Sequence, residues 1–109
     1  MKIAVATEGN SVSQHFGHCN FFTIAEVEEG RVLSCDVIDN PGHEPGFLPV
    51  FLSEKGVGCV IAGGMGKRAQ DLFAEKGIIV VVGASGLVNR VLEDFVNDRL
   101  TTGANICDH

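Results

Sequence analysis

The sequence predicts an α/β fold in which a mixed five-stranded sheet carries helices on both faces. Residues 59–62 and 78–82 are continuous apolar runs rich in β-branched side chains, which is typical of strands buried on both faces of a sheet. Glycines follow each run, and apolar residues at helical spacing come next. Strand–helix–strand units force parallel neighbours through right-handed crossovers. A hairpin predicted between the strands at 20–28 and 31–39 makes these two strands antiparallel, so one strand of the sheet runs opposite to the others.

The elements are predicted in the order β, β, β, α, β, α, β, α. The strands are expected at residues 2–7, 20–28, 31–39, 59–62 and 78–82. The helices are expected at residues 48–55, 65–76 and 87–96. Glu29 and Gly30 give a two-residue hairpin signal between the second and third strands. Gly56 and Gly77 are expected to end the first two helices, and Ser85 is the expected N-cap of the third.

The composition indicates one domain in the chain of 109 residues, which we place at 1–103 with a polar tail at 104–109. A net charge of −6 without a basic cluster argues against a nucleic-acid partner. No apolar run approaches the length needed to span a membrane. Met1 leads almost directly into a strand, which leaves no room for a signal peptide. We therefore predict a cytoplasmic protein with reduced thiols and with no membrane or nucleic-acid partner.

A glycine turn joins the strand at 59–62 to the following helix. A strand that turns through glycines into a helix presents unpaired N–H groups and the positive end of the helix dipole, which favours a small anion or a cluster. The candidate binding residues are Gly63, Gly64, Met65, Gly66, Lys67 and Arg68. A second turn of the same layout adds Ser85 and Gly86. The alternative is a tight strand-to-helix connection without a ligand, which is common in α/β folds.

The loop after the first strand carries three side chains of the metal-ligand type. His15, His18 and Cys19 offer imidazole and thiolate groups to a soft or borderline metal. Alternatively, His15 and Phe16 fix the loop while His18 and Cys19 pack or face solvent. Ligands of open sheets sit outside the carboxyl ends of the parallel strands. We therefore expect this loop and the glycine turns to face one crevice.

The other histidines and cysteines are weaker candidates as ligands. His43 lies in a proline–glycine loop, from which it either reaches over the crevice or faces solvent. Cys107 and His109 form a C-x-H tail that either binds a metal or frays. Cys35 and Cys59 fall in predicted strands, where a cysteine is typically a small core residue. The absence of a C-x-x-C pair argues against zinc-ribbon and thioredoxin motifs.

Several of these segments together resemble a known family. The motifs are S-Q-H-F-G-H-C at 13–19, N-P-G at 40–42, A-G-G-M-G at 62–66 and a glycine-bounded strand at 77–83. Their order is similar to that of the dinitrogenase iron–molybdenum cofactor biosynthesis domain family, which includes nitrogenase accessory proteins and small stand-alone members. The resemblance covers about residues 1–103. It implies a three-layer α/β/α ribonuclease H-like motif with sheet order 3-2-1-4-5 and strand 2 antiparallel.

The resemblance also implies a function. Members bind or carry an iron–sulfur or molybdenum-containing cluster without catalysing a reaction, and a partner protein in cluster assembly is possible. The first strand has no acidic residue before Glu8, so the two-metal chemistry of ribonuclease H enzymes is not expected. The alternative function is a metal-free scaffold or a regulatory protein–protein interaction module. A small-molecule enzyme ranks third, because the sequence contains no evident nucleophile–base pair. The sequence does not identify the cluster, the partner or the oligomeric state.

Overall fold

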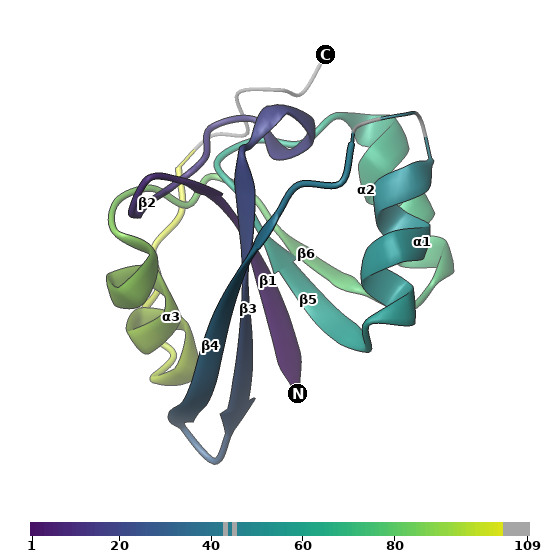
Figure 1. Cartoon of the computed structure of the whole chain (residues 1–109). Helices are drawn as coiled ribbons and strands as arrows, with labels where there is room; N and C mark the ends of the chain where they lie inside the picture. The colour runs from purple at the N-terminus through teal and green to yellow at the C-terminus, as the bar shows by residue number, and fades with distance from the viewer. Residues whose placement is uncertain (43, 45, 104–109) are drawn as a thin grey trace.

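A computed structural model describes residues 1–42, 44 and 46–103 of the chain. The strands are β1 (Lys2–Glu8), β2 (Ser11–Val12), β3 (Phe21–Glu28), β4 (Arg31–Asp39), β5 (Val57–Ile61) and β6 (Ile79–Val81). The helices are a single 3-10 turn η1 (Phe16–His18), α1 (Phe47–Glu54), α2 (Lys67–Glu75) and α3 (Val88–Val96). The sheet lies between α3 on one face and α1 and α2 on the other, as Figure 1 shows.

The predicted sheet topology is confirmed. The strand order is β4-β3-β1-β5-β6, which corresponds to the expected order 3-2-1-4-5, and the short strand β2 also pairs with β1. β1 and β5 are parallel, as are β5 and β6. β3 runs antiparallel to both of its neighbours. The carboxyl ends of β1, β5 and β6 therefore lie at the same end of the sheet.

The central strand explains why the sheet is covered on both faces. Ile3 and Val5 pack with the layer that contains α3, while Ala4 and Ala6 pack with the layer that contains α1 and α2. All four side chains are fully buried. A strand in which both alternating sets of side chains are apolar fits the middle of a three-layer sandwich. β1 thus divides the interior into two cores.

Glycines lie where they were expected, in the turn of the hairpin and after two of the helices. Glu29 and Gly30 have φ angles of 49° and 75°, the left-handed pair that a tight two-residue hairpin requires. Gly56 and Gly77 follow α1 and α2 with φ angles of 82° and 72°. A left-handed residue directly after a helix turns the chain away from the helix axis, and glycine adopts this conformation without steric cost.

Two expected helix starts are wrong. α2 begins at Lys67 and not at Met65, because Gly66 is extended (φ −65°, ψ 154°) and the side chain of Met65 is buried in the core. Ser85 does not cap α3, since the helix begins at Val88 with Leu87 in the N-cap position. Leu87 first forms a β-bridge with Ser11, which keeps the chain extended up to that residue.

The expected burial of Cys35 is also wrong, whereas Cys59 is fully buried as predicted. Cys35 lies on the edge strand β4, where nearly every residue is exposed. The loop expected over residues 8–19 contains the two-residue strand β2 and the turn η1. Within the described part of the chain, no helix is long and apolar enough to cross a membrane. The tail expected from residue 104 onward lies outside the described residues.

Candidate functional site

Three loops meet at the end of the sheet where β1, β5 and β6 have their carboxyl ends. The Gly63 N–H donates to the Ser13 carbonyl (2.8 Å), and the Phe16 N–H donates to the Gly64 carbonyl (3.0 Å). The Gly83 N–H donates to the Gly63 carbonyl (2.9 Å). These backbone bonds join the histidine-bearing loop, the first glycine turn and the second glycine turn. We call this set of three joined loops the rim.

Packing explains why residue 63 is glycine. A Cβ atom at this position would lie 2.8 Å from the Gln14 Cα and 3.0 Å from the Ser13 carbonyl oxygen. Both are backbone atoms, so neither can be moved by a side-chain rotation. Because the Gly63 N–H is already bonded to Ser13, it is not available to a ligand in this conformation. The first half of the turn therefore holds the histidine loop in place.

The second half of the turn faces solvent. Gly66, Lys67 and Arg68 are exposed, whereas Met65 is buried against the core. Gly66 is the N-cap of α2 and has no side chain that could cap the first N–H groups of the helix. The Lys67 ammonium group lies 3.2 Å from Asp71 in an exposed ion pair, an interaction worth only about 0.3–0.5 kcal/mol.

Phe16 anchors the histidine loop. Its buried ring lies 5.5 Å from the Phe22 ring and 5.4 Å from the Phe73 ring, the latter in an edge-to-face arrangement. Such aromatic pairs each add about 0.5–1.5 kcal/mol beyond their buried area. His15 and His18, on either side of this anchor in sequence, are both exposed. The loop thus presents two imidazoles to solvent from a fixed base.

Cys19 differs from the two histidines. Its side chain is buried, its thiol donates to the Phe16 carbonyl (3.2 Å), and burial raises its pKa to about 11. At neutral pH the sulfur is therefore a protonated thiol, whereas metal binding requires a thiolate. Cys19 suits a packing role in this conformation, one of the two alternatives that the sequence left open.

A shallow pocket of about 350 Å³ lies beside the histidine loop. Its lining residues are His18, Cys19, Asn20, Asn40, Pro41 and Gly42. The Asn40 amide holds the two sides of this pocket together, because it donates to the Cys19 carbonyl (2.8 Å) and accepts from the Gly42 N–H (3.0 Å). The N-P-G motif thus serves to position the histidine loop. The sequence showed this motif but not its contact with Cys19.

The second glycine turn contributes less to the rim than expected. Ser85 and Gly86 are exposed, but the Gly86 carbonyl accepts from the Val12 N–H (2.8 Å). The N–H of Val88, at the start of α3, is bonded to the Asn10 carbonyl (2.9 Å). These bonds join the second glycine turn and the start of α3 to the segment at residues 10–12. The N–H of Val88 is therefore not available to a ligand in this conformation.

The described residues contain no group of three or more histidine, cysteine, aspartate or glutamate side chains placed to hold a metal ion. His15, His18 and Cys19 are close in sequence, but they do not form such a group. His43, Cys107 and His109 lie outside the described residues. The rim therefore presents exposed imidazoles, two cationic side chains and helix N–H groups, which suit an anionic, exchangeable ligand better than a chelated ion.

A model of the family described as dinitrogenase iron-molybdenum cofactor matches residues 1–98. The chain belongs to this family. It is 30% identical over 105 residues to the Methanocaldococcus jannaschii protein MJ0580, with 92% of this chain and 89% of that protein covered. The resemblance inferred from the motifs is thus confirmed.

Solved structures show the same fold. The crystal structure of PH0822 is 32% identical to this chain, with a TM-score of 0.88 and 94% of each chain covered. The apo form of the orange protein from Desulfovibrio gigas is 23% identical, with a TM-score of 0.77 and coverage of 95% of this chain and 93% of that one. At the lower identity the likeness concerns the fold alone.

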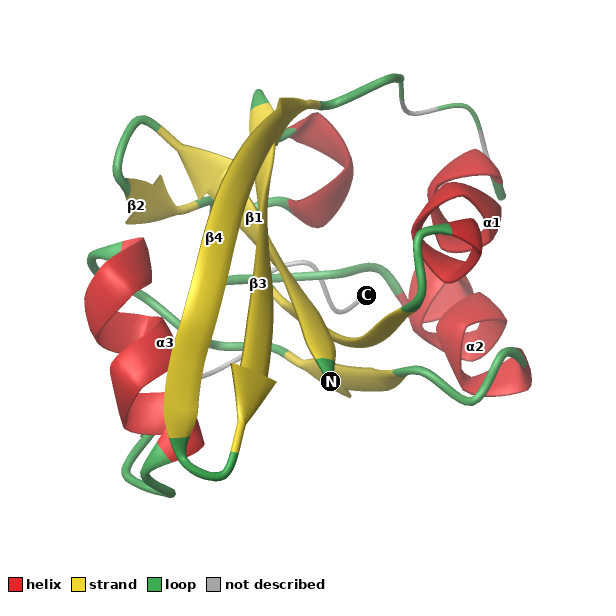
Figure 2. Ribbon diagram, turned by 60° about the horizontal axis from the view of Figure 1, so that its bottom comes forward, coloured by secondary structure: helices red, strands yellow, loops and turns green. Residues whose placement is uncertain are grey.

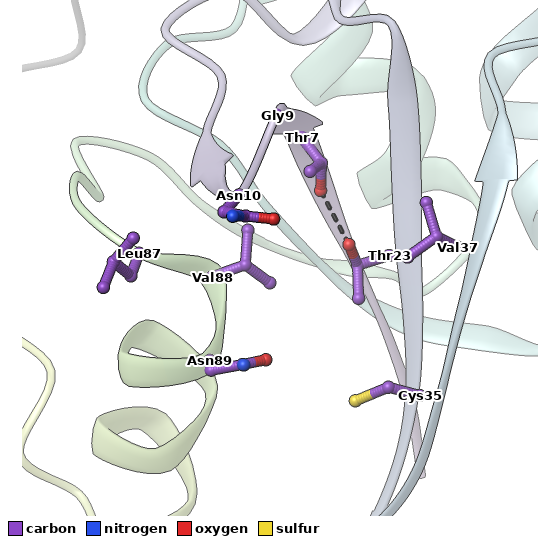
Figure 3. A pocket seen from close by; sticks show the side chains of 9 residues that line it. All are labelled: Thr7, Gly9, Asn10, Thr23, Cys35, Val37, Leu87, Val88 and Asn89. Carbon is purple, nitrogen blue, oxygen red and sulfur yellow. Dashed lines mark hydrogen bonds between the residues drawn. The ribbon is translucent and has the colours of Figure 1, made fainter.

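The structure contains a second pocket, which the sequence did not predict. A pocket of about 400 Å³ lies between α3 and the strands β1, β3 and β4, on the face of the sheet opposite α1 and α2. Figure 3 shows the side chains that line it. Thr7 and Thr23 at its base hydrogen-bond each other through their hydroxyl groups (2.8 Å). Cys35 and Val37 border the pocket from the edge strand. The pocket lies between the start of α3 and the neighbouring strands, an arrangement that no periodicity in the sequence indicates.

Proposed function

We propose that this chain is a non-catalytic carrier of an iron–sulfur or molybdenum–iron–sulfur cluster or of its precursor. The cluster is the cargo of the protein, and the rim is its binding site. His15 and His18 supply exchangeable imidazole ligands. Lys67, Arg68 and the first N–H groups of α2 stabilise the negative charge of the cargo.

The observation that carries this proposal is the hydrogen-bonded contact of the histidine loop with the glycine turn. The bonds from Gly63 to Ser13 and from Phe16 to Gly64 join the loop that carries His15 and His18 to the turn that precedes α2, which supports a shared site. A carrier must release its cargo, and few protein ligands favour release. Membership of a family named for the iron–molybdenum cofactor supports the same class of cargo.

The local chemistry also supports a carrier over an enzyme. The Thr7 and Thr23 hydroxyl groups are bonded to each other, and burial raises the pKa values of the Cys19 and Cys59 thiols to about 11. Groups held in these neutral forms are poor nucleophiles. Binding and release of a cluster require no such nucleophile.

Anaerobic reconstitution tests the proposal. The purified chain is incubated with iron and sulfide, with and without molybdate, and then desalted before visible absorption and metal analysis. We expect wild type to retain a chromophore, His15→Gln/His18→Gln to lose most of it, and Lys67→Gln/Arg68→Gln to retain less than wild type.

The matched control is Lys76→Gln/Arg90→Gln, which removes the same charge from exposed positions away from the start of α2. It should load like wild type. Equally low metal uptake in wild type and in all three variants would overturn the carrier proposal and favour the metal-free interaction module. Uptake that falls equally in the control and in Lys67→Gln/Arg68→Gln would show that net charge, and not the rim, governs binding.

A further inference from the structure

The second pocket lies between two walls, one from the sheet and one from α3. The helix runs alongside β4 and reaches the short strand β2 (Figure 2). Thr23 and Val37 line the pocket from the sheet, and Val88 and Asn89 line it from the helix (Figure 3). The pocket also contacts Thr7 near the carboxyl end of β1, where open α/β sheets bind their ligands. Its volume of about 400 Å³ is typical of small-molecule sites.

The hydroxyl pair at the base of the pocket leaves an acceptor unused. Thr7 and Thr23 are 2% and 4% exposed, and their hydroxyl oxygens lie 2.8 Å apart. The Thr7 hydroxyl donates to the Val5 carbonyl (2.8 Å), so the Thr23 hydroxyl has to donate to Thr7. Among the described residues, no donor reaches the Thr23 oxygen in return. A ligand in this pocket is therefore expected to offer the Thr23 oxygen an N–H or O–H group.

Two carboxamide groups border the pocket. The Asn10 side chain extends from the turn between β1 and β2, and the Asn89 side chain extends from the first turn of α3, both toward the strands (Figure 3). Both residues are exposed, and within the described part of the chain neither side chain has a hydrogen-bond partner. A carboxamide donates and accepts at the same time, so it pairs with the amino group and the adjacent ring nitrogen of adenine.

The side chains that line the pocket favour an uncharged ligand. Among the described residues there, none is a lysine, arginine, aspartate or glutamate. Partial desolvation raises the pKa of the Cys35 thiol, and the neighbouring Asp36 raises it further, so this thiol is neutral at pH 7. The net charge of −6 also disfavours an anion. The pocket thus differs in its chemistry from the rim, for which an anionic cargo is proposed.

We propose that the pocket between α3 and the sheet binds an uncharged adenine derivative, either the free base or its nucleoside. The flat base lies between the Val37 and Val88 side chains, which bury its apolar faces. The Asn89 carboxamide pairs with the edge of the base that carries the amino group, and Thr23 accepts from another N–H of the base or from a sugar hydroxyl. The site uses no residue of the rim, so it does not depend on cluster binding.

Heteronuclear NMR titration of the full chain with adenine and with adenosine tests the site. We expect saturable shifts centred on the amide signals of Gly9, Val88 and Asn89, and the tighter of the two ligands identifies the form that the pocket accepts. Inosine, in which an oxo group replaces the amino group, should bind about tenfold more weakly than adenosine. Adenosine monophosphate should also bind more weakly, because the described lining residues offer its phosphate no cation.

Two variants test the assigned contacts. Asn89→Leu removes an exposed carboxamide, and Thr23→Val removes the buried acceptor; each should raise the dissociation constant for adenosine about tenfold. The matched control is Asn97→Leu, the same change at the C-cap of α3 and outside the lining of this pocket, which should bind like wild type.

The absence of saturable shifts at millimolar adenine and adenosine would overturn the proposal. So would shifts centred on His15 and His18, or inosine or adenosine monophosphate binding as tightly as adenosine. An Asn89→Leu chain that binds adenosine like wild type would also overturn it, and this exposed substitution is not expected to impair folding.

Discussion

The substitution Gly63→Ala tests whether the first glycine turn serves packing. The added Cβ would lie 2.8 Å, 3.0 Å and 3.3 Å from backbone atoms of Gln14, Ser13 and Ala84. The φ angle of Gly63 is not positive, so alanine can adopt its backbone conformation and the steric contact alone is tested. To relieve that contact, the histidine loop has to move away from β5.

The size of the effect follows from two costs. Overpacking of a buried site costs about 1–3 kcal/mol. Displacement of the loop also weakens the hydrogen bonds from Gly63 to Ser13 and from Phe16 to Gly64, worth about 1 kcal/mol each. We expect the free energy of unfolding to fall by about 3 kcal/mol, which corresponds to a decrease in Tm of roughly 10 °C for a domain of this size.

Urea unfolding followed by far-ultraviolet circular dichroism measures this change, because the chain contains no tryptophan or tyrosine for fluorescence. The control is Gly17→Ala in the histidine loop, where a Cβ has no heavy atom within 4 Å and φ is not positive. It should change the stability by less than about 0.5 kcal/mol. If Gly63→Ala matched Gly17→Ala, the steric reasoning would be refuted.

Three further predictions concern the neighbouring polar and thiol groups. Asn40→Ala removes the bonds to Cys19 and Gly42, so urea unfolding should show a loss of about 1–3 kcal/mol, and an unchanged midpoint would contradict the role of the amide. A disulfide reagent at pH 8 should modify the exposed Cys35 in the native Cys107→Ser chain, whereas Cys19 and Cys59 should react only after denaturation; equal rates for all thiols would contradict their burial. Burial raises the pKa of Cys59 from 9.0 to about 11, so the folded chain keeps a proton that the unfolded chain loses, and stability should fall as the pH rises from about 9 to 11. Cys59→Ala should show a shallower decline in unfolding midpoint over this range, and parallel curves would contradict this assignment.

The order and type of the main elements could be predicted from the amino-acid pattern alone. Apolar runs such as those at 59–62 and 78–82, followed by glycine and helical periodicity, leave few topologies, because parallel crossovers are right-handed. The same pattern also predicted that the histidine loop and the glycine turns fall at the carboxyl ends of strands. These features depend on local patterns of side chains, which are readable along the chain.

Which groups are available for binding depends on contacts that form only in the folded chain. The sequence predicted Gly63, Met65 and Cys19 as candidate binding residues. In the structure the Gly63 N–H donates to the Ser13 carbonyl, Met65 lies in the core, and Cys19 is a buried thiol. Cys35 is exposed because β4 is the end strand of the sheet, a consequence of the strand order. Burial and hydrogen-bond partners arise from contacts between segments distant in sequence, so no local pattern specifies them.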